Sequence, residues 1–330
     1  MHFSRIAGVG HYVPANIITN DDLAKRMNTS DAWIQERTGI KERRFFEPGK
    51  DTVASMAARA SEMALERAGI DKSEVDFIVF ATITSDYYFP GSGVLMQREM
   101  GLGTIGALDI KVQCTGFIYA LSIADQFIRT GMYKTILVVG AEIQSTALDI
   151  SDAGRSTAVI FGDGAGACVL TRADEPGIYS THLHADGTYA EELVVMDPGS
   201  SRPVRDFSQM TDFTSTRVHM QGNSVFKHAV TRFPEVINEA LAANNYTAAN
   251  IDLLVPHQAN ARITQYIAAQ MGLPPEKVVS NIDRYGNTTA ASIPIALSEA
   301  WAEGRLKPGH LLCMAAFGSG FTWGSALVRW

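Results

Sequence analysis

Cysteine is scarce in this sequence of 330 residues, and the scarcity limits the classes of protein to which it can belong. The 3 cysteines are odd in number and include no Cys-x-x-Cys pair, so neither a disulfide framework nor a zinc site is indicated. Each of Cys114, Cys168 and Cys313 is therefore either a small buried residue or, in at least one case, a reactive thiol.

Long apolar runs and blocks of like charge are also missing. The longest apolar stretches, residues 77–83 and 136–139, are far shorter than the ~20 residues that span a bilayer. The N-terminus shows no signal-peptide pattern, so we expect a cytoplasmic protein. The net charge of −7 argues against nucleic acid or an anionic membrane as the main partner. Hydrophobic residues at 46% and charged residues at 19% indicate an ordinary globular protein.

Short Val- and Ile-rich runs alternate with longer segments of helical periodicity, a pattern typical of α/β proteins whose strands are buried on both faces. We predict strands and helices in the following ranges. The strands are 75–82, 134–139, 251–255 and 311–315, and the helices are 51–68, 116–130, 224–243 and 261–271.

Three short matches in the same order suggest an internal duplication. Residues 68–79 resemble 244–255, residues 100–102 recur as 271–273, and residues 161–164 resemble 317–320. We therefore predict two similar α/β halves packed face to face, residues 1–174 and 175–330. A pseudo-twofold relation would bring corresponding loops together and give Cys114 a counterpart near Asn287.

Cys114 follows a strand-like run and precedes an apolar helix that ends near Gly131. The dipole and free N–H groups of a helix N-terminus favour thiolate, and lowering the pKa from ~8.5 toward ~7 needs about 2 kcal/mol. The alternative is a small buried apolar residue, and this alternative suits Cys168 and Cys313 better because both lie inside strand-like runs.

His257 ends a buried strand, which is where open α/β sheets place their ligands, although a histidine there can also cap a helix. Asn287 stands in a loop that opens a helix and can equally be a turn residue or N-cap. The glycine-rich segments 8–10 and 162–166 lack the strand-to-helix context of a dinucleotide site, so a nicotinamide cofactor is disfavoured.

Several motifs together resemble the β-ketoacyl-[acyl carrier protein] synthase III family. They are Cys-Thr-Gly-Phe at 114–117, Phe-Gly-Asp-Gly-Ala-Gly-Ala at 161–167, Pro-His-Gln-Ala-Asn at 256–260, Gly-Asn-Thr-Thr-Ala-Ala-Ser at 286–292 and the ending at 321–329. The resemblance implies a homodimeric enzyme with the thiolase fold, a duplicated unit layered as an α-β-α-β-α sandwich. It also implies an acyltransferase of fatty-acid biosynthesis that condenses an acyl-CoA with malonyl-[acyl carrier protein] to start a chain.

In that family scheme Cys114 would take an acyl group from acyl-CoA, and a malonyl thioester would then lose carbon dioxide and attack the acyl-enzyme. His257 and Asn287 match the remaining catalytic positions and would stabilise the enolate. The backbone N–H groups of Cys114 and Ser319 would form the oxyanion hole. The resemblance implies no cofactor, because coenzyme A is part of the thioester substrate.

The resemblance also assigns binding residues. The coenzyme A positions are Trp33, Arg37, Thr38, Arg155, Asn223, Phe226 and Asn260, with Trp33 and Arg155 sandwiching the adenine. Lys227 and Arg262 would dock the acidic carrier protein, and Phe89 would reach across the dimer interface to the acyl pocket. Without the resemblance, Trp33 would be assigned to a core and Arg37 to a solvated helix face.

Three features depart from the family pattern: Ser319 where glycine is usual, a long polar segment at 196–217, and a bulky segment at 86–90. They leave open a relative that uses the same triad on longer acyl-CoAs or on another malonyl thioester in secondary metabolism. A degradative thiolase is disfavoured because its second reactive cysteine is missing, and a non-catalytic carrier-binding scaffold is disfavoured because the whole triad is present.

Overall fold

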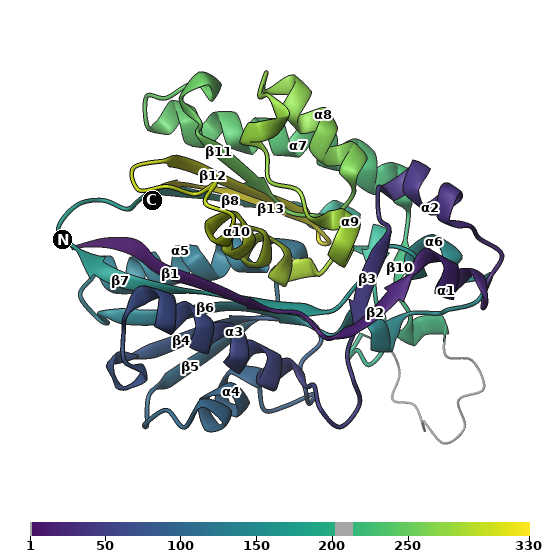
Figure 1. Cartoon of the computed structure of the whole chain (residues 1–330), viewed down its shortest axis with the longest axis horizontal. Coiled ribbons are helices and arrows are strands. Elements are labelled where there is room, and N and C mark those ends of the chain that lie inside the picture. Colours follow the sequence, from purple (N-terminus) through teal and green to yellow (C-terminus); the bar gives the residue numbers. More distant parts are fainter. Residues whose placement is uncertain (1, 202–213) are drawn as a thin grey trace.

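The computed structural model describes residues 2–201 and 214–330, and two sheets organise them (Figure 1). The first sheet has the strand order β1-β7-β6-β4-β5, and the second has the order β11-β12-β13-β8. The strands of the first sheet are β1 (Phe3–Tyr12), β4 (Phe77–Ala81), β5 (Gly106–Ile110), β6 (Thr135–Glu142) and β7 (Gly164–Ala173). Those of the second are β8 (Ile178–Ala185), β11 (Leu253–Pro256), β12 (Leu311–Gly318) and β13 (Thr322–Arg329).

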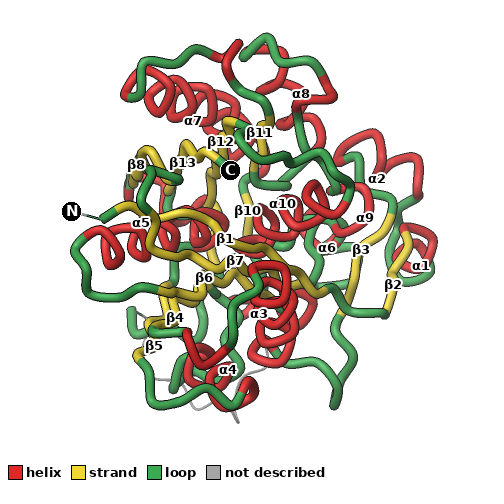
Figure 2. The backbone as a smooth tube through the Cα atoms, turned by 60° about the vertical axis from the view of Figure 1, so that its left-hand side comes forward, coloured by secondary structure: helices red, strands yellow, loops and turns green. Residues whose placement is uncertain are grey.

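Helices cover the outer face of each sheet and fill the space between them. The outer helices are α3 (Val53–Ala68) and α4 (Ser92–Met100) on the first sheet, and α7 (Gly222–Ala243) and α8 (Ala261–Gln270) on the second. The central helices are α5 (Gly116–Arg129) and α10 (Ser292–Ala302), and α10 lies against β1 and β7 in Figure 2. The α-β-α-β-α layering predicted from the sequence is therefore confirmed.

Smaller elements gather at one end of the sandwich, where α2 contacts α8. They are the β2 (Asn16–Thr19) and β3 (Glu42–Phe45) pair, the β9 (Leu193–Val194) and β10 (His219–Met220) pair, and the helices α1 (Asn20–Ala24), α2 (Asp31–Thr38), α6 (Arg155–Ala158) and α9 (Ile282–Tyr285). Within the described ranges, no helix is both long and apolar enough to cross a membrane.

The strands that the sequence predicts are confirmed. They form where they were expected because their apolar composition suits burial on both faces of a sheet. Every residue of β4 and of β6 is buried, and these two strands pair in parallel. The predicted helices also form, with ends that differ by no more than two residues from the expected ones. Cys168 and Cys313 lie fully buried inside β7 and β12, as the packing alternative expects.

The duplication is visible in the topology. Read from the other edge, the second sheet runs β8-β13-β12-β11, which repeats the order β1-β7-β6-β4 of the first. The matched motifs occupy equivalent places: Gly101 and Gly272 both end a helix at φ 63°, and 161–164 and 317–320 both precede an equivalent strand. The division into units 1–174 and 175–330 stays a prediction.

The two central helices begin alike. A short 3-10 turn precedes each, η2 (Gln113–Thr115) before α5 and η9 (Thr289–Ala291) before α10. Gln113 and Thr289 stand 176 positions apart and both have positive φ, 44° and 52°. This equivalence pairs Cys114 with Ala290, so the counterpart expected near Asn287 lies three residues further along the chain.

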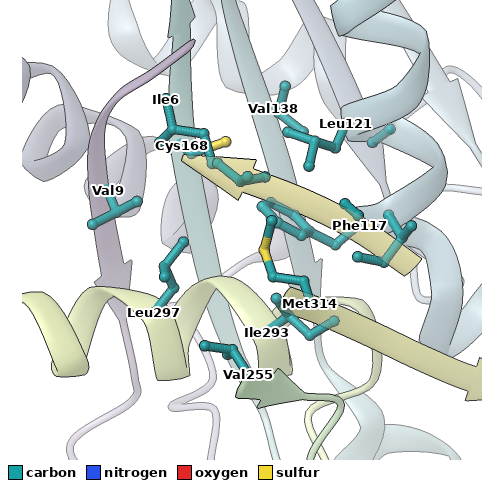
Figure 3. Packing of buried hydrophobic residues seen from close by; sticks show 14 of the residues in the cluster. Ile6, Val9, Phe117, Leu121, Val138, Cys168, Val255, Ile293, Leu297 and Met314 are labelled. Atoms are coloured by element: carbon teal, nitrogen blue, oxygen red, sulfur yellow. The ribbon is translucent and has the colours of Figure 1, made fainter. Parts of the chain in front are cut away.

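The largest hydrophobic cluster joins the two sheets through the central helices (Figure 3). Leu121 of α5 lies beside Val138 of the first sheet, whereas Phe117 of α5 lies beside Met314 of the second sheet, which packs close to Ile293 of α10. Because α5 and α10 bury apolar side chains against both sheets, their positions between the sheets are fixed. The first turns of both helices lie at the site described below.

From the close contact between Gly140 of the first half and Ala290 of the second, we predict one destabilising substitution. A Cβ on Gly140 of β6 would lie 2.3 Å from the backbone oxygen of Ala290, so Gly140→Ala forces backbone to move. We expect the free energy of unfolding to fall by about 3 kcal/mol, the upper part of the range for overpacking. Thermal and denaturant unfolding measure this, with Gly103→Ala as control because nothing lies within 4 Å of that position. Equal stability of the two variants would contradict the close contact.

Candidate active site

A cavity of about 450 Å³ lies at the beginnings of the two central helices. Its lining includes Cys114 from η2, His257 immediately after β11, and Asn287 in the loop before η9. The three side chains come from segments as far apart as 173 positions, and the fold brings them to one cavity, which we call the first cavity.

Cys114 is 6% exposed and stands one turn before α5, a helix without a side-chain N-cap. The second half approaches it closely: a Cβ on Gly318 would lie 2.6 Å from the Cys114 Cβ, so only glycine fits at the end of β12. The backbone N–H groups of Cys114 and Ser319 bond to the sulfur and lower its pKa. Burial and the nearby Glu142 carboxyl act more strongly and raise the pKa of the thiol to about 12.

This result corrects the expectation of a thiol with a lowered pKa. The helix N-terminus acts as predicted, but the local sequence does not show that the sulfur is removed from water beside a buried acid. Cys114 is therefore a neutral thiol at pH 7.

Glu142, at the end of β6, is fully buried and accepts several hydrogen bonds. The donors are the Thr84 hydroxyl at 2.5 Å, the Thr82 hydroxyl at 3.3 Å, and the backbone N–H groups of Ile83 and Ala290. Burial outweighs these bonds and raises the Glu142 pKa to about 8. The carboxyl therefore ties the first half to the turn that follows Asn287, and above pH 8 it places a negative charge near Cys114.

His257 is 1% exposed, and its backbone N–H donates to the Ala315 carbonyl of β12 at 2.8 Å. Its ring Nδ1 lies 2.6 Å from the Ser292 hydroxyl, and among the described residues its buried Nε2 has no hydrogen-bond partner. Burial lowers the imidazole pKa to about 3, so the ring is neutral at physiological pH.

Asn287 is 5% exposed, and its Oδ1 accepts the Thr289 N–H at 2.8 Å. The turn function considered for this residue is therefore real. Because Oδ1 is used in the turn, the Nδ2 amino group is the part of the amide left to donate into the first cavity.

Trp33, on α2, lies at the outer part of the first cavity together with Arg37. The guanidinium of Arg37 stands 4.5 Å from the centre of the indole ring, and that of Arg155 stands 4.8 Å from it. Arg155 also donates to the Asn28 carbonyl at 2.6 Å. The expected adenine sandwich is therefore closed here, and Arg155 must move before a ring can enter between it and Trp33.

The other predicted coenzyme A positions share the lining of the first cavity: Thr38, Asn223, Phe226 and Asn260. Asn260 caps α8 through the Arg262 N–H and donates to the Arg37 carbonyl, so it joins α8 to α2. Arg262 also lines the cavity, with its guanidinium 5.5 Å from the Phe226 ring. Lys227 is exposed and outside the lining.

A second cavity, of about 500 Å³, meets the first at Cys114. Its lining includes Ser319, whose hydroxyl donates to the Leu193 carbonyl, and it extends to Tyr87 and Tyr88. Phe89 is 80% exposed and lines neither cavity of its own chain. Of the long segment at 196–217, residues 202–213 lie outside the described residues.

Comparison with known proteins assigns the family. Residues 108–187 match the family model for 3-oxoacyl-[acyl-carrier-protein (ACP)] synthase III, and residues 241–330 match the model for its C-terminal part. The chain is 47% identical over 328 residues to the β-ketoacyl-[acyl-carrier-protein] synthase III of Methylococcus capsulatus, covering 99% of both chains. The chain belongs to the β-ketoacyl-[acyl carrier protein] synthase III family.

Solved structures of the family agree with the fold. The 3-oxoacyl-[acyl-carrier-protein] synthase III of Aquifex aeolicus is 43% identical with a TM-score of 0.90, and the match covers 99% of this chain and 100% of that one. The priming β-ketosynthase of the R1128 polyketide biosynthetic pathway is 34% identical with a TM-score of 0.91, covering 99% and 96%. The predicted thiolase fold is thereby confirmed.

Sequence reasoning missed two residues at this synthase III site, Glu142 and Ser292. Ser292 ends the motif at 286–292, but its bond to the imidazole depends on α10 passing beside the end of β11. Glu142 ends a buried strand. An acidic residue at the end of an otherwise apolar strand could have indicated a functional side chain in the sequence.

The surroundings of Cys114 predict how its reactivity changes with pH. With a thiol pKa of about 12, alkylation by iodoacetamide rises about tenfold for each pH unit where the charge of Glu142 is constant, and less steeply around pH 8, where Glu142 ionises and raises the thiol pKa. At pH 9 Glu142 is ionised, so Glu142→Gln removes a like charge and increases the rate, by about tenfold if the pKa falls by one unit.

Peptide mass spectrometry of the alkylated Cys114 measures the rate, and Glu239→Gln is a control on the outer helix α7. An equal rate in Glu142→Gln and the unaltered protein, at unchanged melting temperature, would show that Glu142 charge does not act on the thiol.

Proposed function

We propose that this protein condenses an acyl-CoA with malonyl-[acyl carrier protein], with loss of carbon dioxide, and so initiates fatty-acid synthesis by forming 3-oxoacyl-[acyl carrier protein]. The observation that carries the proposal is the meeting of a thiol, a neutral imidazole and a carboxamide in one cavity. Membership of the synthase III family supports it.

In the first step the Cys114 sulfur attacks the acyl thioester carbon. The bond to the coenzyme A sulfur breaks, the acyl group becomes attached to Cys114, and the thiol proton leaves with coenzyme A. The backbone N–H groups of Cys114 and Ser319 lower the pKa of the sulfur, which supports their assignment as the donors that would hold the oxygen of the tetrahedral intermediate.

In the second step the malonyl thioester enters the first cavity. Its carboxylate leaves as carbon dioxide, and the bonding electrons form an enolate whose oxygen receives hydrogen bonds from His257 Nε2 and Asn287 Nδ2. The enolate carbon then attacks the acyl group, and Cys114 departs as thiolate and is reprotonated. Because carbon dioxide loss supplies the carbanion, no base has to remove a proton from carbon.

The outer part of the first cavity is assigned to coenzyme A and to the pantetheine arm of the carrier protein. Trp33, Arg37, Thr38, Arg155, Asn223, Phe226 and Asn260 would bind it, and cationic Arg37 and Arg155 suit its phosphates. Lys227 and Arg262 would meet an acidic carrier protein at the mouth. The thioesters are substrates, and the proposed chemistry uses no separate cofactor.

We further propose a cytoplasmic homodimer. Tyr87, Tyr88 and Phe89 are exposed aromatic neighbours, and burial of so much apolar area against a second copy is favourable. In such a dimer Phe89 would reach the second cavity of the other copy.

The alternatives differ in how well this chain supports them. The polyketide priming enzyme is less similar, at 34% identity, than the synthase III relatives above. A degradative thiolase needs a second reactive cysteine, whereas Cys313 is fully buried in β12 and away from both cavity linings. A non-catalytic scaffold would not need three polar side chains buried at one cavity.

The proposed division of labour is tested with two variants. Cys114→Ala should form no acyl-enzyme with acetyl-CoA, whereas Asn287→Ala should acylate normally and lose condensation by about a hundredfold or more. Intact-mass spectrometry reads acylation, and product formation from malonyl-[acyl carrier protein] reads condensation.

Cys313→Ala and the exposed Asn238→Ala serve as controls and should keep both activities. An acyl adduct on Cys114→Ala, or on neither variant, would contradict the assignment. Absence of malonyl decarboxylation in the unaltered protein would support the scaffold instead.

The second cavity predicts the acyl range. Its volume of about 500 Å³ compares with about 30 Å³ for one water in the liquid, so chains longer than acetyl have room. We expect hexanoyl-CoA as well as acetyl-CoA to acylate Cys114. Ala147→Phe fills the second cavity and should lose at least tenfold in hexanoyl but not acetyl transfer. Intact-mass spectrometry measures the rate at which each acyl-CoA acylates Cys114. If hexanoyl-CoA does not acylate the unaltered protein, the assignment of this cavity to the acyl chain is refuted.

A further inference from the structure

The imidazole of His257 has one nitrogen bonded and one free. Nδ1 lies 2.6 Å from the Ser292 Oγ, whereas Nε2 is buried and without a partner among the described residues. A buried polar atom without a hydrogen-bond partner is destabilising. Nε2 is therefore the atom that substrate must satisfy, and its protonation state decides whether it can donate to an enolate oxygen or would repel it.

Ser292 decides this state through the bonds its hydroxyl can make. A serine hydroxyl has one proton to donate and two lone pairs. The Gln258 backbone N–H donates to the Ser292 Oγ at 3.4 Å and uses a lone pair. Among the described residues, this buried hydroxyl has no hydrogen-bond acceptor other than His257 Nδ1, so its proton is directed to Nδ1, which accepts it.

Gln258 is itself held in place. Its Nε2 donates to the carbonyls of Pro256, at 2.7 Å, and Val279, at 3.2 Å, and its Oε1 accepts the Asn281 N–H at 3.1 Å. The backbone N–H that faces Ser292 therefore has a fixed direction. The chain from the Gln258 N–H through the Ser292 hydroxyl to Nδ1 leaves the ring proton on Nε2.

We propose that Ser292 is a positioning residue that fixes His257 as the tautomer with its proton on Nε2, ready to donate to the enolate oxygen. The opposite tautomer would present a bare lone pair to that oxygen. The use of this tautomer in condensation rests on the function proposed above, whereas the tautomer itself does not.

Nitrogen-15 NMR of the imidazole tests the tautomer without any substrate. In the unaltered protein, selectively labelled histidine should show His257 Nε2 protonated and Nδ1 unprotonated, assigned by comparison with His257→Gln. A protonated Nδ1 would overturn the proposal. If the unaltered protein has Nε2 protonated but shows no condensation activity, the proposed function is contradicted and the tautomer assignment still holds.

Kinetics of Ser292 variants test the consequence. Ser292→Ala should lower kcat for condensation by about 10- to 100-fold, the range for residues that orient a functional histidine, with little change in KM or in acylation of Cys114. Ser292→Thr keeps the hydroxyl and should recover most of the rate when its melting temperature matches the unaltered protein, and Ser292→Cys, a weak donor, should fall between.

Ser298→Ala is the matched control, because Ser298 is another buried serine of α10 whose Oγ lies 2.7 Å from a histidine Nδ1, that of His11, away from the cavity lining. It should retain the condensation rate. Equal kcat in Ser292→Ala and the unaltered protein would overturn the proposal, as would equal losses in Ser292→Ala and Ser298→Ala.

Discussion

The close packing of the first turns of α5 and α10 is the constraint on which the rest of the structure depends. Glycines at 140 and 318 let one half approach the other at distances that leave no room for a Cβ. Because the strands beneath are buried on both faces, the helices cannot slide away from this contact. The sulfur of one half and the polar groups of the other are therefore held together by the core.

Burial shapes the chemistry of the site as much as proximity does. The thiol and the imidazole are both neutral at physiological pH, because burial moves each pKa toward the uncharged form. Negative charge that develops on a substrate oxygen then meets oriented N–H donors in a medium of low polarity, where each hydrogen bond is stronger than in water. A permanently charged site would bind the resting substrates more tightly but would favour the reaction less.

Most of the fold followed from the sequence because local pattern and tertiary environment agree. The all-apolar run of β4 and the periodic helix α3 are buried as their residues require, and the motif matches at 101 and 272 correspond to the same helix-ending turn. The grouping of Cys114, His257 and Asn287 was predicted by family resemblance and by the duplication together. Periodicity alone identified none of them as catalytic.

What the sequence did not provide depends on three-dimensional surroundings. The rise in the Cys114 pKa comes from desolvation and from Glu142, which is 28 positions away. The bond between Ser292 and His257 joins residues 35 positions apart. Arg155 was correctly placed beside Trp33, but only coordinates show that it rests directly on the indole. The proposed contribution of Phe89 involves a second copy, which a single chain does not contain.

The junction of the two cavities at Cys114 has a consequence for the order of events. An acyl group attached to the sulfur can lie in the second cavity, which vacates the first for the next thioester. In the proposed cycle, the acyl-CoA and the malonyl thioester would enter the first cavity one after the other. Free coenzyme A bound in that cavity would compete with both. The frequency of chain initiation by the proposed reaction would therefore depend on the ratio of free to acylated coenzyme A.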